Sequence, residues 1–382
     1  MTVDLMSALR EGVASEPSAA RPAGIEIRQD LEPAGGLPVQ PPSYEGRLEI
    51  HKRHIDGDEH LTVELDSVGS AANRIEEVLL DLHRAGQYPL PVSDTTVPLP
   101  DGDPVTITTL EAPHRLFDAW LRLSASEDGD GSFETSERGQ ELTRAHLGAL
   151  DPILETSSHD LLFGAWDSHR KGPHGQLRIA RALTSSLIGL DPVEQAQFAA
   201  RRDPLNLGDG SESKGDKQAK RLSEQGLSSI PPQRRIPYEE NEKGEARRFG
   251  GRVADHRGGV SITSARYLGY LSFPALRRLG FTRYDAVEVR VLLATLALYA
   301  VALRCAAGWD LRSRCTLLAT GPLALSLVAA DGTRESIELD LDGLRKLFEE
   351  QVAAVELEDR SVHLEAGAAL EKLVAANMTA AA

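Results

Sequence analysis

The chain has 382 residues, of which 41% are hydrophobic and 26% are charged, the composition of a globular protein that can bury a sizeable core. Its 42 Lys and Arg against 58 Asp and Glu give a net charge of -16, which taken alone argues against a protein that coats nucleic acid. The N-terminus carries no secretory signal pattern, and the 2 cysteines have neither metal-ligand spacing nor the companions of a disulfide framework. We therefore expect a protein of the reducing cytoplasm.

The first part of the chain predicts little regular structure before a strand-turn-helix unit. Residues 1–45 are rich in Pro, Ala and Gly, which favours irregular chain with one short strand at 24–28. Residues 59–66 alternate as a strand, and apolar residues within 75–82 then repeat at helical spacing.

Small and polar residues stand between this strand and its helix. A helix N-terminus presents free N–H groups, and Arg74 adds a bidentate donor, so Ser67, Ser70 and Asn73 could belong to a phosphate cradle. The alternative is ordinary N-capping by Ser67 or Ser70. The residues alone leave both interpretations open.

Another β-prone run, 105–110, precedes a region that we expect to be mainly helical. Helices fit 113–123, where a proline stands in the first turn, 140–150 and 177–188. In the last of these the apolar positions share one face, which leaves Arg178 and Arg181 together on another.

A cluster within this region contains the residue types of metal and general acid-base sites: His159, Asp160, Trp166, Asp167, His169 and His174. No metal-ligand spacing such as HExxH is present, so polar residues on a solvated turn are the favoured interpretation. Trp166 is either a stacking face for a base or a core tryptophan. No GxSxG, P-loop or GxGxxG motif stands in a strand-to-helix context, which argues against hydrolase, NTPase and dinucleotide-binding functions.

Residues 201–258 have the composition of a long mobile insertion. From Arg201 to Arg257 there are 13 Lys and Arg against 10 Asp and Glu, net +3, which leaves 29 against 48, net -19, elsewhere. Positive charge is therefore concentrated in one segment, which could neutralise phosphates or form a solvated loop.

The C-terminal third returns to a mixed pattern. A strand at 259–272 precedes the longest helix, 284–306, whose apolar run is too short to cross a membrane and predicts a buried helix. Three strands fit 314–340, with Asp331-Gly332 as a hairpin turn, and two helices follow.

Five stretches in this order carry a family resemblance: LDSVGSAANRIE, TTLEAPHRLFDA, LLFGAWDSHRKGPHGQLRIARALTSSLIGLD, SEQGLSSIPP and GGVSITSARYLGYLSF. Together they cover most of 66–273 and resemble the Csb-type backbone subunit of the CRISPR type I-U (I-G) effector. That subunit belongs to the Cas-seven group of the RAMP superfamily.

The resemblance implies an α+β fold, an RRM-like (ferredoxin-like) palm with inserted helical finger and thumb or loop elements. We expect one elaborated RAMP subunit over 1–382 with its palm core at 59–110 and 259–340. Residues 111–200 would form the helical insertion, and 201–258 the basic mobile insertion or thumb.

The resemblance also implies a non-catalytic subunit that binds CRISPR guide RNA (crRNA) within a Cascade ribonucleoprotein for antiviral defence. Copies of the chain would form a filament along the guide and present it for pairing with target DNA. The other expected partners are further Cascade subunits and a separate helicase-nuclease, with no membrane, metal or cofactor. Two alternatives stay open: a RAMP-type metal-dependent endoribonuclease, and a protein-interaction scaffold without RNA.

A guide-binding subunit must accept any sequence, so its contacts should go to phosphate and sugar rather than to base edges. The aromatic RNA-stacking signature of an RRM is absent here, which puts base stacking on the palm in doubt. We expect the RNA-binding residues to be Ser70, Asn73, Arg74, His114, Arg115, Trp166, Arg178, Arg181, Lys217, Lys220, Arg221 and Arg257.

Overall fold

The structure is a computed structural model of the whole chain. It describes residues 4–16, 21–44, 47–100, 102–126, 131–170, 175–195, 197–201, 230–235 and 259–381.

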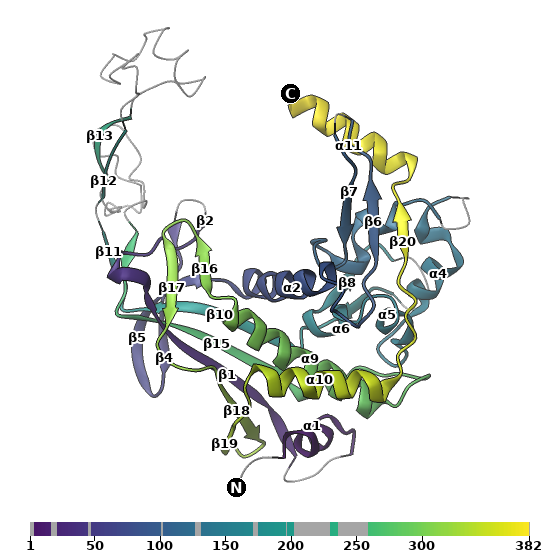
Figure 1. Cartoon of the computed structure of the whole chain (residues 1–382), viewed down its shortest axis with the longest axis horizontal. Helices are drawn as coiled ribbons and strands as arrows, with labels where there is room; N and C mark the ends of the chain where they lie inside the picture. The colour runs from purple at the N-terminus through teal and green to yellow at the C-terminus, as the bar shows by residue number, and fades with distance from the viewer. Residues whose placement is uncertain are drawn as a thin grey trace.

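An antiparallel nine-stranded sheet forms the centre of the described structure (Figure 1). Its strands lie in the order β16 (Trp309–Arg312), β17 (Cys315–Ala319), β1 (Pro22–Pro33), β15 (Ser264–Ser272), β10 (Leu183–Leu190), β5 (Asp58–Asp66) and β4 (Ile50–Ile55). Beside them, β18 (Ala324–Ala329) pairs with β1, and β19 (Arg334–Ile337) pairs with β18. The long central strand β1 corrects the short strand expected at 24–28.

Helices cover one face of this sheet, because alternate residues of its strands are apolar. In β1, Ile25, Ile27 and Leu31 are buried, while Arg28 and Asp30 are only half-buried. The covering helices are α1 (Leu5–Val13), α2 (Val68–Arg84), α8 (Phe273–Arg277), α9 (Ala286–Ala306) and α10 (Leu341–Val355). Most of α9 is buried, and 78% of its most apolar window lies inside the protein, which confirms the predicted core helix.

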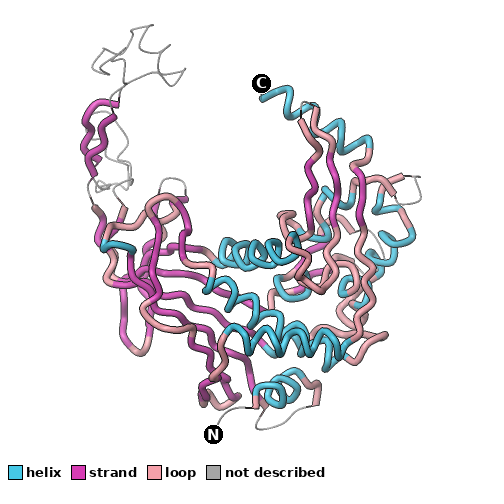
Figure 2. Tube along the Cα trace, in the orientation of Figure 1, coloured by secondary structure: helices cyan, strands magenta, loops and turns pink. Residues whose placement is uncertain are grey.

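A second body holds short helices and small sheets (Figure 2). Its helical turns are η2 (Arg115–Phe117), α3 (Ala119–Arg122), η3 (Phe133–Thr135), α4 (Glu137–Arg144), α5 (Asp151–Leu154) and α6 (Asp160–Phe163). Its strands are β8 (Ala165–Asp167) with β9 (Leu177–Ile179), and β6 (Asp94–Val97) with β7 (Val105–Thr108) and β20 (His363–Glu365). Helix α11 (Ala368–Ala381) follows β20.

The described elements form an open crescent (Figures 1 and 2). One arm holds β6, β7 and α11, the other holds β16 and β17, and α2 lies between them. Small paired strands complete the second arm: β2 (Ser43–Tyr44) with β3 (Arg47–Leu48), β11 (Val193–Glu194) with β14 (Val260–Ser261), and β12 (Gln197–Arg201) with β13 (Ile230–Arg235). A short turn, η1 (Ala34–Gly36), follows β1.

The helix predicted at 177–188 is wrong, since the chain there forms β9 and β10. Its apolar positions fit a helix face, but β10 pairs with β15 on one side and with β5 on the other. Those ladders satisfy the backbone of the strand and bury Leu183 and Leu187, which overrides the helical spacing.

The helices predicted at 113–123 and 140–150 are also shorter than expected. Asp118 accepts hydrogen bonds from the backbone N–H groups of His114 and Trp120, which separates η2 from the single turn of α3. Helix α4 ends at Arg144.

The main sheet draws on more of the chain than the expected palm ranges. It takes β5 and β15–β19 from these ranges, but β1 and β4 lie before them and β10 lies within 111–200. Strands β6 and β7, although within 59–110, belong to the separate three-stranded sheet. The three C-terminal strands and the two helices after them match the prediction.

Candidate nucleic-acid interface

Two adjoining cavities lie where the second body meets α2. One, the α2 cavity, has a volume of about 610 Å³ and is lined by α2 and residues 110–115. The other, the β8 cavity, has a volume of about 480 Å³ and is lined by residues 113–115, 163–166 and 178–181. Because both include Pro113 and Arg115, we treat them as one groove.

The groove brings together every predicted RNA-binding residue within the described part of the chain. These are Ser70, Asn73, Arg74, His114, Arg115, Trp166, Arg178 and Arg181. The remaining four, Lys217, Lys220, Arg221 and Arg257, lie outside the described residues. Residues as far apart in sequence as 70 and 181 therefore share one surface.

The β8 cavity carries an aromatic face beside free cations. Trp166 and Arg178 are cross-strand partners in the β8–β9 ribbon, and the Arg178 guanidinium lies 5.0 Å from the centre of the indole ring. Trp166 is 51% exposed, so the core-tryptophan interpretation is wrong. A half-exposed indole next to an arginine can stack a base while the cation approaches its phosphate.

Arg181 closes the other side of this cavity. Its Nε donates to the Phe163 carbonyl over 3.0 Å, and its terminal nitrogens make no hydrogen bond to the described part of the chain. The lining of the β8 cavity contains three arginines and His114, and no acidic residue. An anion is therefore favoured there.

The α2 cavity has mixed charge. Its lining holds Arg74, Arg84 and Arg115, but also Glu76, Glu77, Asp81 and Glu111. Arg84 is paired with Glu111 at 2.7 Å. Phosphate should therefore prefer the β8 cavity.

The turn before α2 forms an ordinary helix N-cap. Ser67 Oγ accepts the N–H of Ser70 at 3.3 Å, as the capping interpretation expected. The Arg74 Nε donates to the nearly buried Asp66 at 3.1 Å, and its Nη2 donates to the Leu311 carbonyl at 2.6 Å. Arg74 thus lines the groove while two of its nitrogens, Nε and Nη2, donate within the protein.

Arg115 differs still more from the expectation of a surface cation. It is only 8% exposed, and it donates to both carboxylate oxygens of Glu76, at 2.5 and 2.7 Å, and to the Gly164 carbonyl at 3.1 Å. Burial raises the pKa of Glu76, and the hydrogen bonds from Arg115 oppose that rise. The guanidinium of Arg115, which we expected to contact RNA, is thus held inside the wall of the groove.

Beneath the groove, His159 and Asp160 are fully buried and not part of a solvated turn. Burial lowers the pKa of His159 to about 3 and raises the pKa of Asp160 to about 7. Both side chains are therefore close to neutral inside the protein near pH 6. Among the described residues no group of three His, Cys, Asp or Glu could hold a metal ion; His174 lies outside them.

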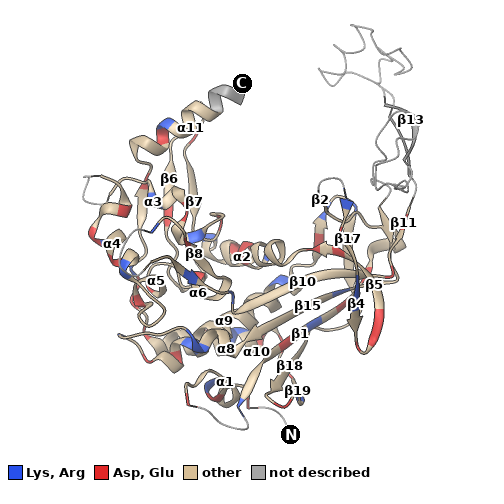
Figure 3. Ribbon diagram, turned by 180° about the vertical axis from the view of Figure 1, so that it is seen from behind, with Lys and Arg blue, Asp and Glu red and all other residues tan. Residues whose placement is uncertain are grey.

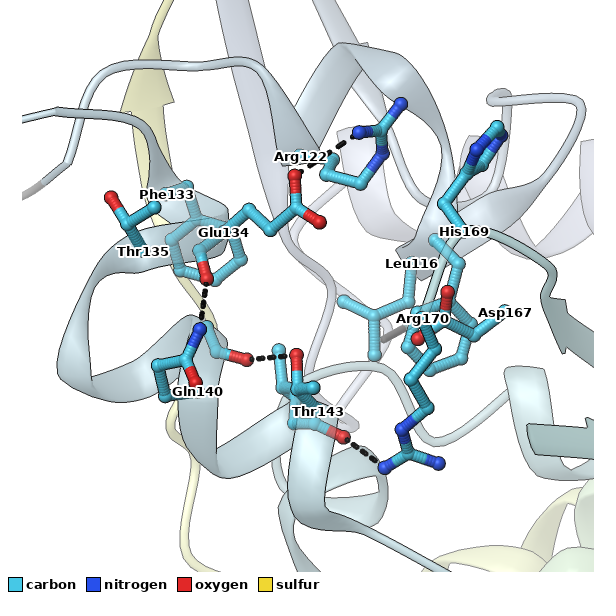
Figure 4. Close-up of a pocket in the computed structure, with 13 residues that line it drawn as sticks. Leu116, Arg122, Phe133, Glu134, Thr135, Gln140, Thr143, Asp167, His169 and Arg170 are labelled. Carbon is cyan, nitrogen blue, oxygen red and sulfur yellow. Dashed lines mark hydrogen bonds and ion pairs between the residues drawn. The ribbon is translucent and has the colours of Figure 1, made fainter. Parts of the chain in front are cut away.

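Figure 4 shows a third cavity, of about 370 Å³, which shares no lining residue with the groove. Asp167, His169 and Arg170 line it, opposite an Arg122–Glu134 ion pair of 3.1 Å. We did not predict this cavity. The signal was the alternation of β8, which exposes Trp166 and buries Asp167, so the two side chains leave the strand on opposite faces.

Residues 25–193 match the model of the family described as CRISPR-associated protein GSU0053. The match covers 169 of the 382 residues. The match supports, over that region, the expected resemblance to CRISPR-associated proteins, and it includes all eight groove residues named above.

A solved structure, that of Csc2 from Thermofilum pendens, aligns with 92% of this chain and 85% of its own at 9% sequence identity and a TM-score of 0.31. No curated protein matches the chain.

Proposed function

We propose that this CRISPR-associated protein is a non-catalytic backbone subunit that binds guide RNA. The observation that carries the proposal is the groove: eight residues selected from sequence converge on it. Its β8 cavity offers RNA the exposed side chains of Arg178, Arg181 and Trp166, and no acidic residue lines it. Contacts of this kind read phosphate and a stacking face, and so accept any guide sequence.

The proposed palm is RRM-like and is made of β1, α2, β10, β15, α9 and the β17–β18 pair. A ferredoxin-like unit has the chain order β-α-β-β-α-β, with its first and third strands in the centre of the sheet. The sheet order supports the assignment, because β1 and β15 are adjacent, β10 flanks β15, and β17 and β18 flank β1. Strands β5 and β4 would then extend the palm beyond β10.

In the proposed effector, several copies line one guide in the cytoplasm and present it for pairing with target DNA. Other Cascade subunits complete the particle, and a separate helicase-nuclease cuts the target. Most of the long apolar helix α9 is buried in the core, so this helix offers the scaffold alternative no docking surface. The buried state of His159 and Asp160 gives the endoribonuclease alternative no support.

The test is copurification with RNA. The protein is coexpressed with a CRISPR array, purified across a salt series, and the bound nucleic acid is sequenced and incubated with magnesium or manganese. We expect guide-length RNA that stays intact and is lost steeply as salt rises. Protein without RNA at every salt would refute guide binding, and shortened RNA would favour the endoribonuclease.

Arginine variants test the groove itself. Arg178→Ala and Arg181→Ala should each weaken RNA binding for all sequences and lower the slope of log affinity against log salt by about one. Lys346→Ala, which removes an exposed cation on α10, is the matched control and should leave the slope unchanged. If the slope of log affinity against log salt is the same in both groove variants as in Lys346→Ala, the groove is not the RNA site.

A further inference from the structure

We propose that Arg115 and Glu76 are positioning residues that hold the two halves of the groove in register and do not contact RNA. The proposal rests on the proposed RNA-binding function and assigns a new role to a buried ion pair within that site.

Arg115 connects three separate elements. Its guanidinium binds Glu76 of α2 through two hydrogen bonds and the carbonyl of Gly164, the residue between α6 and β8, through a third. It also lies 5.9 Å from the centre of the Phe163 ring. Its own backbone has φ 52°, the left-handed region that a non-glycine residue adopts only when its surroundings hold it there.

The Gly164 turn transmits this position to Arg181. The carbonyls of Phe163 and Gly164 are consecutive, and they accept from Arg181 and Arg115 respectively. Gly164 has φ 87°, and a Cβ there would lie 2.9 Å from the Ile179 carbonyl oxygen and 3.0 Å from Arg181 Cγ. The Gly164 turn therefore has little conformational freedom. The hydrogen bond from Arg115 to the Gly164 carbonyl fixes this turn relative to α2.

The burial of the pair argues for position rather than contact. Glu76 is 3% exposed, and an arginine already committed to both of its oxygens would have to leave a buried carboxylate unpaired to reach a phosphate. Arg178 and Arg181, by contrast, have exposed side chains on the same wall. The contact role thus falls to them, and the positioning role to Arg115.

Glu76→Gln should change RNA affinity in opposite directions, depending on whether Glu76 acts through its charge alone or positions the wall of the groove. Glu76→Gln removes a negative charge from beneath an RNA groove, so on charge alone it should tighten binding. If Glu76 positions the wall, the same substitution should weaken binding; changes at residues that touch no ligand alter affinity by roughly 2- to 30-fold. Glu77→Gln, on the exposed neighbour that lines the same cavity, is the matched control and should tighten binding slightly.

Conservative variants separate contact from position further. Arg115→Lys keeps the positive charge but cannot form the paired hydrogen bonds to Glu76, so it should weaken RNA binding as much as Arg115→Gln does. Glu76→Asp keeps the negative charge on a shorter side chain and should also weaken binding. If Arg115 touched a phosphate, Arg115→Lys would retain most of the affinity and Arg115→Gln would lower the salt slope by about one.

The experiment is a fluorescence anisotropy titration of the full chain with labelled guide RNA over a salt series, with a melting curve for each variant. The expected result is weaker binding by Glu76→Gln, Glu76→Asp and Arg115→Lys, tighter binding by Glu77→Gln, and a wild-type salt slope for Arg115→Lys. Folded Glu76→Gln that binds as tightly as Glu77→Gln would overturn the inference. If Glu76→Gln does not fold, a folded Glu76→Asp or Arg115→Lys variant with wild-type affinity would overturn the inference instead. Failure of the wild-type chain to bind RNA would refute the proposed function itself.

Discussion

Two kinds of arginine line the groove, and their hydrogen bonds distinguish them. Arg178 and Arg181 keep terminal nitrogens without hydrogen bonds to the described part of the chain, while Arg74 and Arg115 donate to Asp66 and Glu76. All four looked alike in the sequence. Only the position of an acidic partner in space decides which guanidinium can approach a phosphate, and the sequence does not give that position.

Trp166 should contribute to RNA binding through stacking. Trp166→Ala should cost about 1 to 3 kcal/mol of binding free energy, because base–aromatic stacking has that size. The salt slope should stay the same, since no charge is removed. Anisotropy titrations of Trp166→Ala and Trp166→Phe test this; Phe should retain most of the affinity, and an equal loss in both variants would contradict stacking.

The buried pair His159 and Asp160 should give two opposite pH dependences that offset each other. The pKa of His159 falls from 6.5 to about 3 on folding, so its contribution to stability is present above pH 6.5 and is lost as pH falls toward 3. The pKa of Asp160 rises from 3.8 to about 7, so its contribution is present below pH 3.8 and is lost as pH rises toward 7. Between these limits the two slopes cancel.

Single substitutions should reveal each slope. In Asp160→Asn the free energy of unfolding should rise with pH up to about 6.5, and in His159→Gln it should fall up to about pH 7, each by up to about 1.4 kcal/mol per pH unit. Urea unfolding at several pH values between 4.5 and 7 measures both, with the wild-type chain as control. Parallel pH profiles for the two variants would show that the pair does not titrate in this way.

At the scale of elements, the secondary structure was predicted correctly where an apolar pattern runs over many residues. It was predicted wrongly where pairing with a distant strand determines the conformation. Helix α9 and strand β5 were predicted almost to their ends, because each pattern runs over many residues. Strand β10 was predicted as a helix because its apolar positions satisfy both periods over so short a stretch. Pairing with β15, more than 70 residues away in sequence, stabilises the strand conformation instead.

The site followed the same rule. Its residues were identified from a resemblance carried by several short blocks, and all eight that the structure describes line the groove. Their individual roles were not predicted, since exposure and partners depend on contacts such as that of Arg74 with Leu311 in β16. The third cavity was missed because its lining residues are spread over 116–170 and come together only in the fold.

Two glycines should show how differently the elements tolerate a methyl group. A Cβ at Gly24 in β1 would collide with the Leu271 carbonyl oxygen and the Tyr270 ring, so Gly24→Ala should lower the free energy of unfolding by about 1 to 3 kcal/mol. A Cβ at Gly69, in the first turn of α2, meets nothing within 4 Å, and Gly69→Ala should raise it by about 0.5 to 1 kcal/mol. Denaturant unfolding measures both, and a neutral Gly24→Ala would mean that the central strands can separate.

At the scale of the whole molecule, charge limits how tightly one copy can hold RNA. The chain carries -16 overall, and Figure 3 shows acidic and basic residues intermixed over the described elements. The β8 cavity supplies only a few free cations, so a single copy should bind weakly. Several copies on one strand would gain affinity through effective concentration, because each bound copy raises the chance that a neighbour stays.

RNA length should therefore control both stoichiometry and salt resistance. With RNAs of increasing length, native mass spectrometry should detect one more copy at each fixed increment of length, and the salt concentration needed for release should rise with the number of copies. The physical reason is that the RNA is the shared ligand that offsets repulsion between acidic subunits. A homopolymer RNA of matched length is the control for sequence and should behave identically. Assemblies whose size ignores RNA length would instead favour a scaffold that polymerises without a guide, because protein contacts alone would then set the length of the filament.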